Sequence, residues 1–231
     1  MRFLGRLVGY GLLAATLLVV LVQLWFFAQV VWLNFVNPRS SAFMEASLDR
    51  LRVKNPRIQL RYQWMPYERI SPNLKRAVVA AEDAKFLDHE GFDWEAIQKA
   101  IAKNEKRGRV VAGASTISQQ LAKNLFLSGD RSYVRKAEEA VITSMIELVM
   151  SKRRILELYL NLAEWGEGVF GAEAAARAHF GVPASALSAE QAAWLAVILP
   201  SPRRYDRGRS TPYIASRAET IRGRMLSAAI P

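Results

Sequence analysis

Glu82 and Asp83 open a segment whose side chains can move protons, EDAKFLDHEGFD at positions 82–93. The apolar residues before it recur at helical spacing, which predicts a helix that begins at Ser71 and ends at this pair of carboxylates. A carboxylate at that end faces the negative pole of the helix, which raises its pKa and favours general-base chemistry near neutral pH. An ordinary solvated helix end is the alternative interpretation of this segment.

A second segment, GASTISQQLAKN at 113–124, suits a hydroxylated or anionic ligand. A helix capped near Ser115 would align three polar side chains in one row, Thr116, Gln120 and Lys123. The neighbouring row is apolar and would anchor the helix: Ile117, Leu121 and Leu125. Free amides at the helix start also suit a phosphate. A solvated polar face is the alternative.

A third segment concentrates positive charge at a predicted helix start near Ser132. Arg131, Arg135 and Lys136, with Lys123, could hold a diphosphate, because guanidinium groups bind phosphate oxygens in a planar, bidentate manner. Arg135 and Glu139 are also spaced for a surface ion pair worth only about 0.2–0.5 kcal/mol, which is the simpler interpretation.

Taken together, these segments resemble the peptidoglycan glycosyltransferases, family 51 among the glycosyltransferases, in their monofunctional biosynthetic form. Five motifs occur in order: ED-x-x-F-x-x-H-x-G-F-D at 82–93, G-A-S-T-I-x-Q-Q-x-x-K-N at 113–124, R-K-x-x-E at 135–139, S-K-R-R-I-L-E-L-Y-L-N at 151–161 and EWG-x-G-x-FG at 164–171. Ala114, where the family often has glycine, is a mild variation.

The resemblance implies an inverting transfer from a growing glycan on undecaprenyl diphosphate to the GlcNAc 4-hydroxyl of lipid II, which forms a β-1,4 bond. Glu82 would be the base, and Glu139 a second catalytic glutamate on the donor side. The leaving diphosphate would be stabilised by four cations, Lys123, Arg131, Arg135 and Lys136. A divalent cation, Mg²⁺ or Mn²⁺, could assist at the diphosphate, while no protein metal site and no organic cofactor are expected.

Further motif positions are expected to bind substrate or to hold the shape of the site: Asp83, His89, Ser115, Thr116, Gln120 and Asn124. Structural roles are expected for four residues of the fourth motif region: Lys152, Glu157, Tyr159 and Asn161. An apolar patch facing lipid is a further hypothesis, with core packing as its alternative, and would comprise Phe86, Phe92 and Trp94.

The predicted fold is mainly α, a lysozyme-like helical glycosyltransferase domain behind one N-terminal transmembrane helix. The uncharged run from Leu12 to Val36 can span a hydrocarbon core of ~30 Å and exceeds the apolar region of a cleaved signal peptide, the alternative here. Arg2 and Arg6 precede the run, which indicates a cytoplasmic N-terminus. We therefore expect an inner-membrane, single-pass protein with an anchor at 1–37 and a periplasmic domain at 38–231.

Within the domain, the sequence predicts a hinge after Pro38, a short strand or extended lead-in from Ile58 to Tyr67, and a mobile basic loop over 103–113. Helices are expected from Ser71, from Ser115 or Thr116, from Ser132 with a restart near Ser151, over 171–181, and after a capping box of Ser188 and Gln191.

Charge and composition restrict the partners. The net charge of +11 includes Arg2 and Arg6 of the anchor, so the remaining chain carries +9 (11 − 2) and favours anionic partners. The expected partners are lipid II, the growing lipid-linked glycan, membrane lipid, and division or cell-wall synthesis proteins, with no nucleic acid. The absence of cysteine, with only His89 and His179, argues against disulfides and structural zinc.

Two other classes of protein remain open at this stage: a lytic, glycan-cleaving enzyme and a non-catalytic division scaffold. A lytic enzyme has no diphosphate to release, and a scaffold has no need of Glu82 with Lys123. A bifunctional enzyme with a transpeptidase domain is disfavoured by length and by the absence of an S-x-x-K motif, so no transpeptidase activity is expected.

Overall fold

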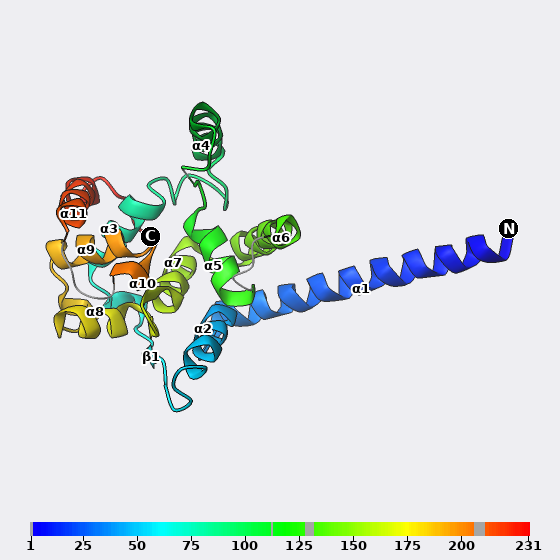
Figure 1. Cartoon of the computed structure of the whole chain (residues 1–231), viewed down its shortest axis with the longest axis horizontal. Coiled ribbons are helices and arrows are strands. Elements are labelled where there is room, and N and C mark those ends of the chain that lie inside the picture. Colours follow the sequence, from blue (N-terminus) through cyan, green and yellow to red (C-terminus); the bar gives the residue numbers. More distant parts are fainter. Residues whose placement is uncertain (1, 112, 128–131, 206–210) are drawn as a thin grey trace. The chain divides into compact units, whose positions relative to one another are not determined.

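The computed structural model describes residues 2–111, 113–127, 132–205 and 211–231. It is mainly helical, as the sequence predicts, with a few short strands (Figure 1). The chain divides into two compact units, one ending at Val36 and the other running from Asn37 to Pro231.

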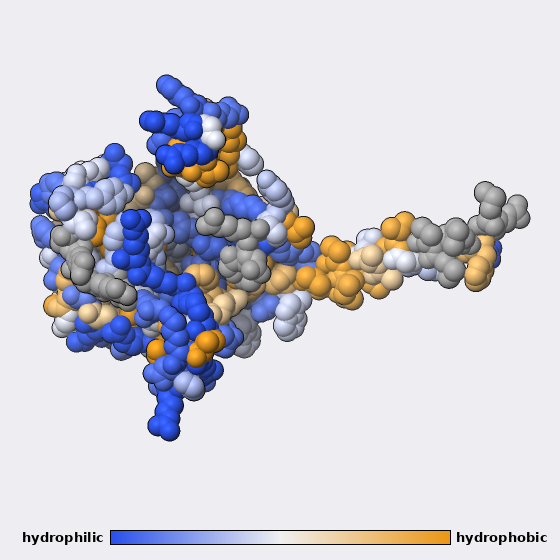
Figure 2. Space-filling view, in the orientation of Figure 1, coloured by the Kyte–Doolittle hydropathy of each residue, from blue (hydrophilic) through white to orange (hydrophobic). Residues whose placement is uncertain are grey.

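The first unit is a single helix, α1 (Arg2–Phe35). Its segment Gly9–Phe35 is 27 residues long with a mean hydropathy of 2.3, so it is long and apolar enough to cross a membrane. Figure 2 shows apolar residues over much of its surface. These properties are consistent with a membrane anchor.

The second unit begins with non-helical residues 37–41, where a hinge was expected, and continues with a helix that the sequence did not predict. Helix α2 (Ala42–Arg52) starts at the N-cap Ser41, whose hydroxyl accepts a hydrogen bond from the Met44 amide at 3.3 Å. It buries Met44, Ser47 and Leu51, which lie on one helical face, and packs against α5. The mixed composition of this segment hid that face from the sequence prediction.

Three helices form one packed group: α3 (Pro72–Glu82), α9 (Ala189–Ile198) and α11 (Pro212–Met225). The predicted caps of two of them are confirmed. Ser71 accepts from the Asn73 amide at the start of α3, and Ser188 forms a capping box with Gln191 before α9. A short helix, α10 (Pro202–Tyr205), follows α9.

A second group consists of α5 (Ile117–Phe126), α6 (Tyr133–Val149) and α7 (Lys152–Leu162), in which α5 packs on both partners. Thr116 is the N-cap of α5 and forms a capping box with Gln119. Ser132 and Ser151 cap α6 and α7, as the predicted start and restart require.

A small sheet lies beside α8 (Ala172–Phe180), with β1 (Arg61–Tyr62), β3 (Val169–Phe170) and β2 (Glu164–Gly166) in that order. Strand β3 pairs in parallel with β1 and antiparallel with β2. The strand expected over 58–67 is therefore only two residues long. Short 3-10 helices, η1 (Tyr67–Arg69) and η2 (Ala184–Ala186), complete the unit.

Helix α4 (Trp94–Arg107) corrects the prediction of a loop over 103–113, because residues 103–107 form its last turns. Asp93 caps its start by accepting from the Ala96 amide at 2.8 Å, and Gly108 ends it in the left-handed conformation. None of its residues is buried. Figure 2 shows this helix with a hydrophilic and a hydrophobic side.

Candidate active site

Glu82 lies at the last position of α3, at the boundary between the two helical groups. Its Oε2 atom accepts a hydrogen bond of 2.8 Å from the amide nitrogen of Gln120 on α5. Burial raises the pKa of Glu82, while the Gln120 hydrogen bond and the charges of Lys123 and Arg217 lower it to a smaller extent. The upward direction agrees with the sequence prediction, but burial rather than the helix dipole is its largest cause.

Gln120 is itself oriented by a residue of α7. The Tyr159 hydroxyl donates to the carbonyl oxygen of Gln120 at 2.9 Å, which directs the amide nitrogen towards Glu82. Tyr159 is almost completely buried, and burial raises the pKa of its hydroxyl well above the ordinary value. A relay of neutral donors thus runs from the protein core to the carboxylate of Glu82.

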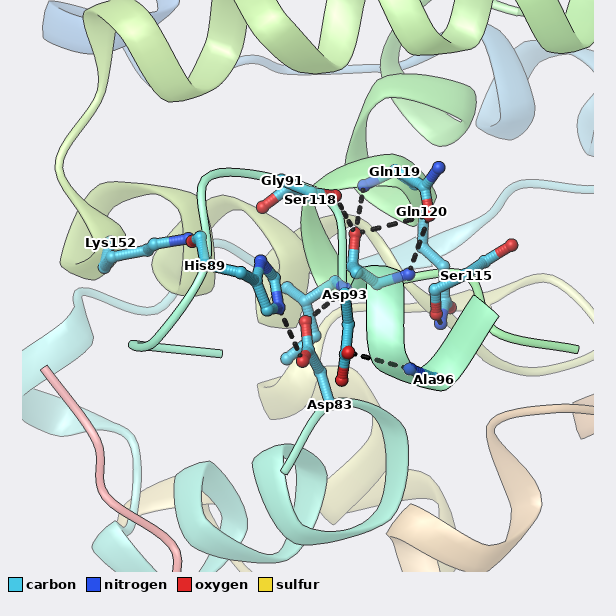
Figure 3. A network of polar contacts seen from close by, with 12 residues as sticks. Asp83, His89, Gly91, Asp93, Ala96, Ser115, Ser118, Gln119, Gln120 and Lys152 are labelled. Atoms are coloured by element: carbon cyan, nitrogen blue, oxygen red, sulfur yellow. Dashed lines mark hydrogen bonds and ion pairs between the residues drawn. The ribbon is translucent and has the colours of Figure 1, made fainter. Parts of the chain in front are cut away.

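Asp83 belongs to an internal network of polar contacts (Figure 3). It accepts from the Ile117 amide at 3.1 Å and lies 2.9 Å from Nε2 of His89. Burial raises the pKa of Asp83, and the contacts with His89 partly offset this. Asp83 therefore ties the end of α3 to the first turn of α5.

The turn after Asp83 is held by two further hydrogen bonds, and the lysine that makes one of them is itself paired. The Thr116 hydroxyl donates to the Gly91 carbonyl at 2.7 Å, and Lys152 donates to the His89 carbonyl at 2.6 Å and to Glu147 at 2.8 Å. Glu147 also accepts from Ser118. Thr116 is therefore a buried cap whose hydroxyl is committed to the turn, and the residue also lines the cavity that contains Glu82.

The predicted cations meet on the other side of α5. Glu139 of α6 is buried, with 4% of its side chain exposed, and accepts from Arg135 at 2.8 Å and from Lys136. The Nε of Arg135 is buried without a hydrogen-bond partner among the described residues. Burial lowers the pKa of Lys123, and the charge of Glu139 partly opposes that shift. Arg131 lies outside the described residues.

Three neighbouring cavities are lined by these groups. A cavity of about 730 Å³ is lined by Glu82, Asp83, Ser115 and Gln120, among others. A second, of about 310 Å³, is lined by Lys123, Arg135, Lys136 and Glu139, and shares Ser115 and Gln120 with the first. A third, of about 130 Å³, adjoins Gln120, Lys123 and Asn124. The fold thus brings the acidic and basic motif residues to adjoining cavities, together called the cleft.

The predicted apolar patch is wrong at Phe86, which is 0% exposed and belongs to the core. Phe92 stacks on Trp94 with ring centroids 5.6 Å apart, and Trp94 is 67% exposed. The structural roles expected in the fourth motif agree with the contacts of Asn161, whose amide bonds both backbone polar groups of Met65 at 2.8 and 2.9 Å. Glu157 likewise accepts from the Tyr67 amide at 2.9 Å.

Three residues near the site were missed at the sequence level. Arg217 of α11 lines the large cavity with Glu82, Phe43 of α2 lines the two smaller ones, and Glu147 pairs with Lys152. Only Glu147 carried a signal, since an acid inside the apolar run VITSMIELVM indicates a buried, paired charge. Arg217 and Phe43 reach the site only through the tertiary fold.

Comparison with known proteins decides the family. Residues 51–226 match the Transglycosylase family. The chain belongs to this family. It is 60% identical over 231 residues to the biosynthetic peptidoglycan transglycosylase of Azoarcus sp. (strain BH72), with 100% of both chains covered. It is 62% identical over 209 residues to that of Nitrosospira multiformis, covering 90% of this chain and 91% of the relative.

A third biosynthetic peptidoglycan transglycosylase, from Janthinobacterium sp. (strain Marseille), is 56% identical over 231 residues with 100% of both chains covered. The similarity to two of these transglycosylases extends through the N-terminal helix as well as the helical unit that contains the cavities. The family suggested by the five motifs is therefore confirmed on the whole chain.

Proposed function

We propose that this transglycosylase is a peptidoglycan glycosyltransferase that polymerises lipid II into β-1,4-linked glycan strands and releases undecaprenyl diphosphate. The observation that carries the proposal is the pair of cavities that meet at Ser115 and Gln120. One contains a carboxylate with a raised pKa, and the other contains three cations. A glycosyl transfer from a diphosphate needs these two environments on opposite sides of the reacting carbon.

On the acceptor side, Glu82 takes the proton of the sugar 4-hydroxyl as that oxygen attacks the anomeric carbon of the donor. Its raised pKa makes it a stronger base than an exposed glutamate, and the Gln120 hydrogen bond fixes the carboxylate. Attack from this side, opposite the leaving group, inverts the anomeric configuration. Ser115 and Gln120, which line both cavities, are placed to bind sugar hydroxyl groups.

On the donor side, the bond from the anomeric carbon to the diphosphate oxygen breaks, and its electrons leave with the diphosphate. Lys123, Arg135 and Lys136 line the cavity that would receive this charge. The guanidinium group of Arg135, which lines this cavity, suits planar bonding to phosphate oxygens. Glu139 holds Arg135 and Lys136 in place and acts on the leaving group through them.

A divalent cation bound to the diphosphate would find one protein carboxylate, Glu139, among the described residues of the cation cavity. Mg²⁺ usually retains several waters and is held by one or two carboxylates together with substrate phosphates. Glu139 is the carboxylate that lines the cation cavity in the described chain, and no group of three potential metal-ligating acids or histidines occurs among the described residues. The ion would neutralise phosphate charge, with Glu139 as its one protein ligand.

The test is polymerisation of fluorescent lipid II by purified full-length protein in detergent with Mg²⁺ or Mn²⁺, with products resolved on a gel. The wild type is expected to give a ladder, and Glu82→Gln to be slower by about 10³-fold because it lacks the base. Glu90→Gln is the matched control, an exposed acid in the same motif. No ladder from the wild type, or a normal rate from Glu82→Gln, would contradict the proposal.

The same assay separates the alternative classes. A lytic enzyme would shorten preformed glycan without consuming lipid II, and a scaffold would do neither. The three cations around the smaller cavity favour synthesis, because glycan cleavage releases no diphosphate. Binding to division or cell-wall synthesis proteins stays a prediction.

We also propose that α1 anchors the protein in the inner membrane as a single pass, with a cytoplasmic N-terminus and residues 38–231 in the periplasm. Arg2 and Arg6 before the apolar segment support this orientation. The chain has no cysteine, so a single Ser216→Cys variant reports one exposed site on α11. A membrane-impermeant maleimide should label this cysteine in spheroplasts. Labelling only after lysis would contradict the proposed orientation and place the domain in the cytoplasm.

A further inference from the structure

Phe43 is a half-buried aromatic residue in the first turn of α2, the helix that follows the apolar segment in the chain. It lies outside all five motifs. Its ring lines the cation cavity beside Ser115 and Lys123, and it also lines the smallest cavity beside Asn124 and Tyr159. The two cavities therefore adjoin each other at Phe43, Gln120 and Lys123, which line both.

The surroundings of the ring suit a sugar next to a diphosphate. The Nζ atom of Lys123 lies 6.0 Å from the ring centroid, so a diphosphate held by Lys123 would end close to the ring. The smallest cavity adds the side chain of Asn124, which can bond hydroxyl groups, beside Gln120 and Glu164, which bond Tyr159 and Arg203. A pyranose needs this combination, because its hydroxyl groups project around the edge while its carbon-bound hydrogens form apolar faces.

Phe43 supplies the flat apolar surface of this combination. Tyr159 also lines the smallest cavity, but it is nearly completely buried and its hydroxyl is committed to Gln120. Phe43 is held in place by the buried ring of Phe170, which meets it edge-on at 6.4 Å. Arg203 lies 5.8 Å from the ring centroid and is fixed by two hydrogen bonds to Glu164 of 3.1 and 3.0 Å.

We propose that Phe43 is a substrate-binding residue that stacks against the donor sugar bonded to the diphosphate. This inference rests on the proposed function, since it requires a lipid-linked sugar in the cleft. It assigns to α2 a direct part in the donor subsite: the helix that follows the membrane segment in sequence carries one wall of the cavity.

The experiment measures KM and kcat for lipid II with full-length wild type and with Phe43→Leu, Phe43→Ala and Phe43→Tyr. Leucine keeps apolar volume but loses the flat face, so Phe43→Leu should raise KM about tenfold with little change in kcat. Phe43→Ala should do at least the same, and Phe43→Tyr should keep the wild-type KM. Phe180→Leu is the matched control, a half-buried aromatic residue on α8 away from these cavities.

Thermal unfolding of each variant separates binding from packing. An unchanged midpoint in Phe43→Leu together with a raised KM supports the stacking role. A wild-type KM in Phe43→Leu, or a lower midpoint with no change in KM, overturns it while leaving the proposed polymerisation intact. A wild type that makes no polymer overturns the proposed function and the Phe43 assignment with it.

Discussion

Glu82 and Glu139 are the same side chain in two different electrostatic settings, one on each side of α5. Glu82 accepts from a neutral amide, and its burial raises its pKa. Glu139 is more completely enclosed and pairs with two cations. The difference teaches that the environment assigns the role: a carboxylate with a neutral donor is available to take a proton, whereas one that holds two cations organises positive charge.

After the loss expected of Glu82→Gln, the next largest effect on activity is expected from removing the charge of Glu139. Glu139→Gln should slow polymerisation about 100-fold, because Arg135 and Lys136 lose the group that aligns them with the diphosphate. The acid limb of the pH–rate profile should keep its position, since Glu82 still titrates. An acid limb that disappears in Glu139→Gln would assign the proton transfer to Glu139 and reverse the comparison.

Gly91 lies in the turn after Asp83, close to α6, and its substitution should lower the stability of the fold. Its φ is +87°, and an added Cβ would lie 2.8 Å from Cγ2 of Thr143 and 3.1 Å from Cγ of Glu147, both on α6. Gly91→Ala should destabilise the fold by about 2 kcal/mol, a factor of about thirty in the folding equilibrium. Urea denaturation measures this, with Gly223→Ala as control because nothing lies within 4 Å there. Equal urea midpoints for Gly91→Ala and wild type would show that the turn can shift away from α6 without loss of stability.

The hydrogen-bond relay from Tyr159 through Gln120 to Glu82 can be tested at Tyr159. Tyr159→Phe removes the donor that orients Gln120 and should lower kcat about tenfold. The buried ring remains, so the thermal midpoint should change little. Measurement of kcat and the midpoint together checks this. An unchanged kcat would mean that Gln120 is oriented without Tyr159.

Arg217 should give the smallest effect. Its charge lowers the pKa of Glu82, so Arg217→Gln should raise that pKa further. Glu82 acts as a base only when ionised; a higher pKa therefore moves the acid limb of kcat/KM to higher pH. At a pH within that limb, kcat/KM should fall about threefold. At higher pH, the variant and the wild type should have the same kcat/KM. A shift towards lower pH would contradict this electrostatic assignment.

The sequence predicts some helices and misses others, and the difference has a physical reason. The helix from Ser71 to the acidic pair, the capping box at Ser188 and the anchor depend on neighbouring residues, so their patterns are local. Helix α4 was missed because its basic last turns, residues 103–107, were assigned together with Gly108 to a loop. Helix α2 was missed because its buried face needs α5 as a partner.

The candidate site divides in the same way. Motif spacing alone indicated Glu82, Lys123, Arg135 and Glu139, and the fold places these residues around adjoining cavities. It could not indicate that Thr116 faces the Gly91 turn, or that Phe86 is enclosed by the core. The direction of a side chain depends on what packs against its helix.

The sequence by itself determined the family, the mainly helical class, the apolar N-terminal helix and most of the charged groups of the site. These properties depend on residue types and on spacing within single segments. Only the tertiary structure decided which carboxylate pairs with an amide and which with cations, and which distant residues, Phe43 and Arg217, line the cavities. The reason is that burial and electrostatic coupling depend on distances between segments far apart in the chain.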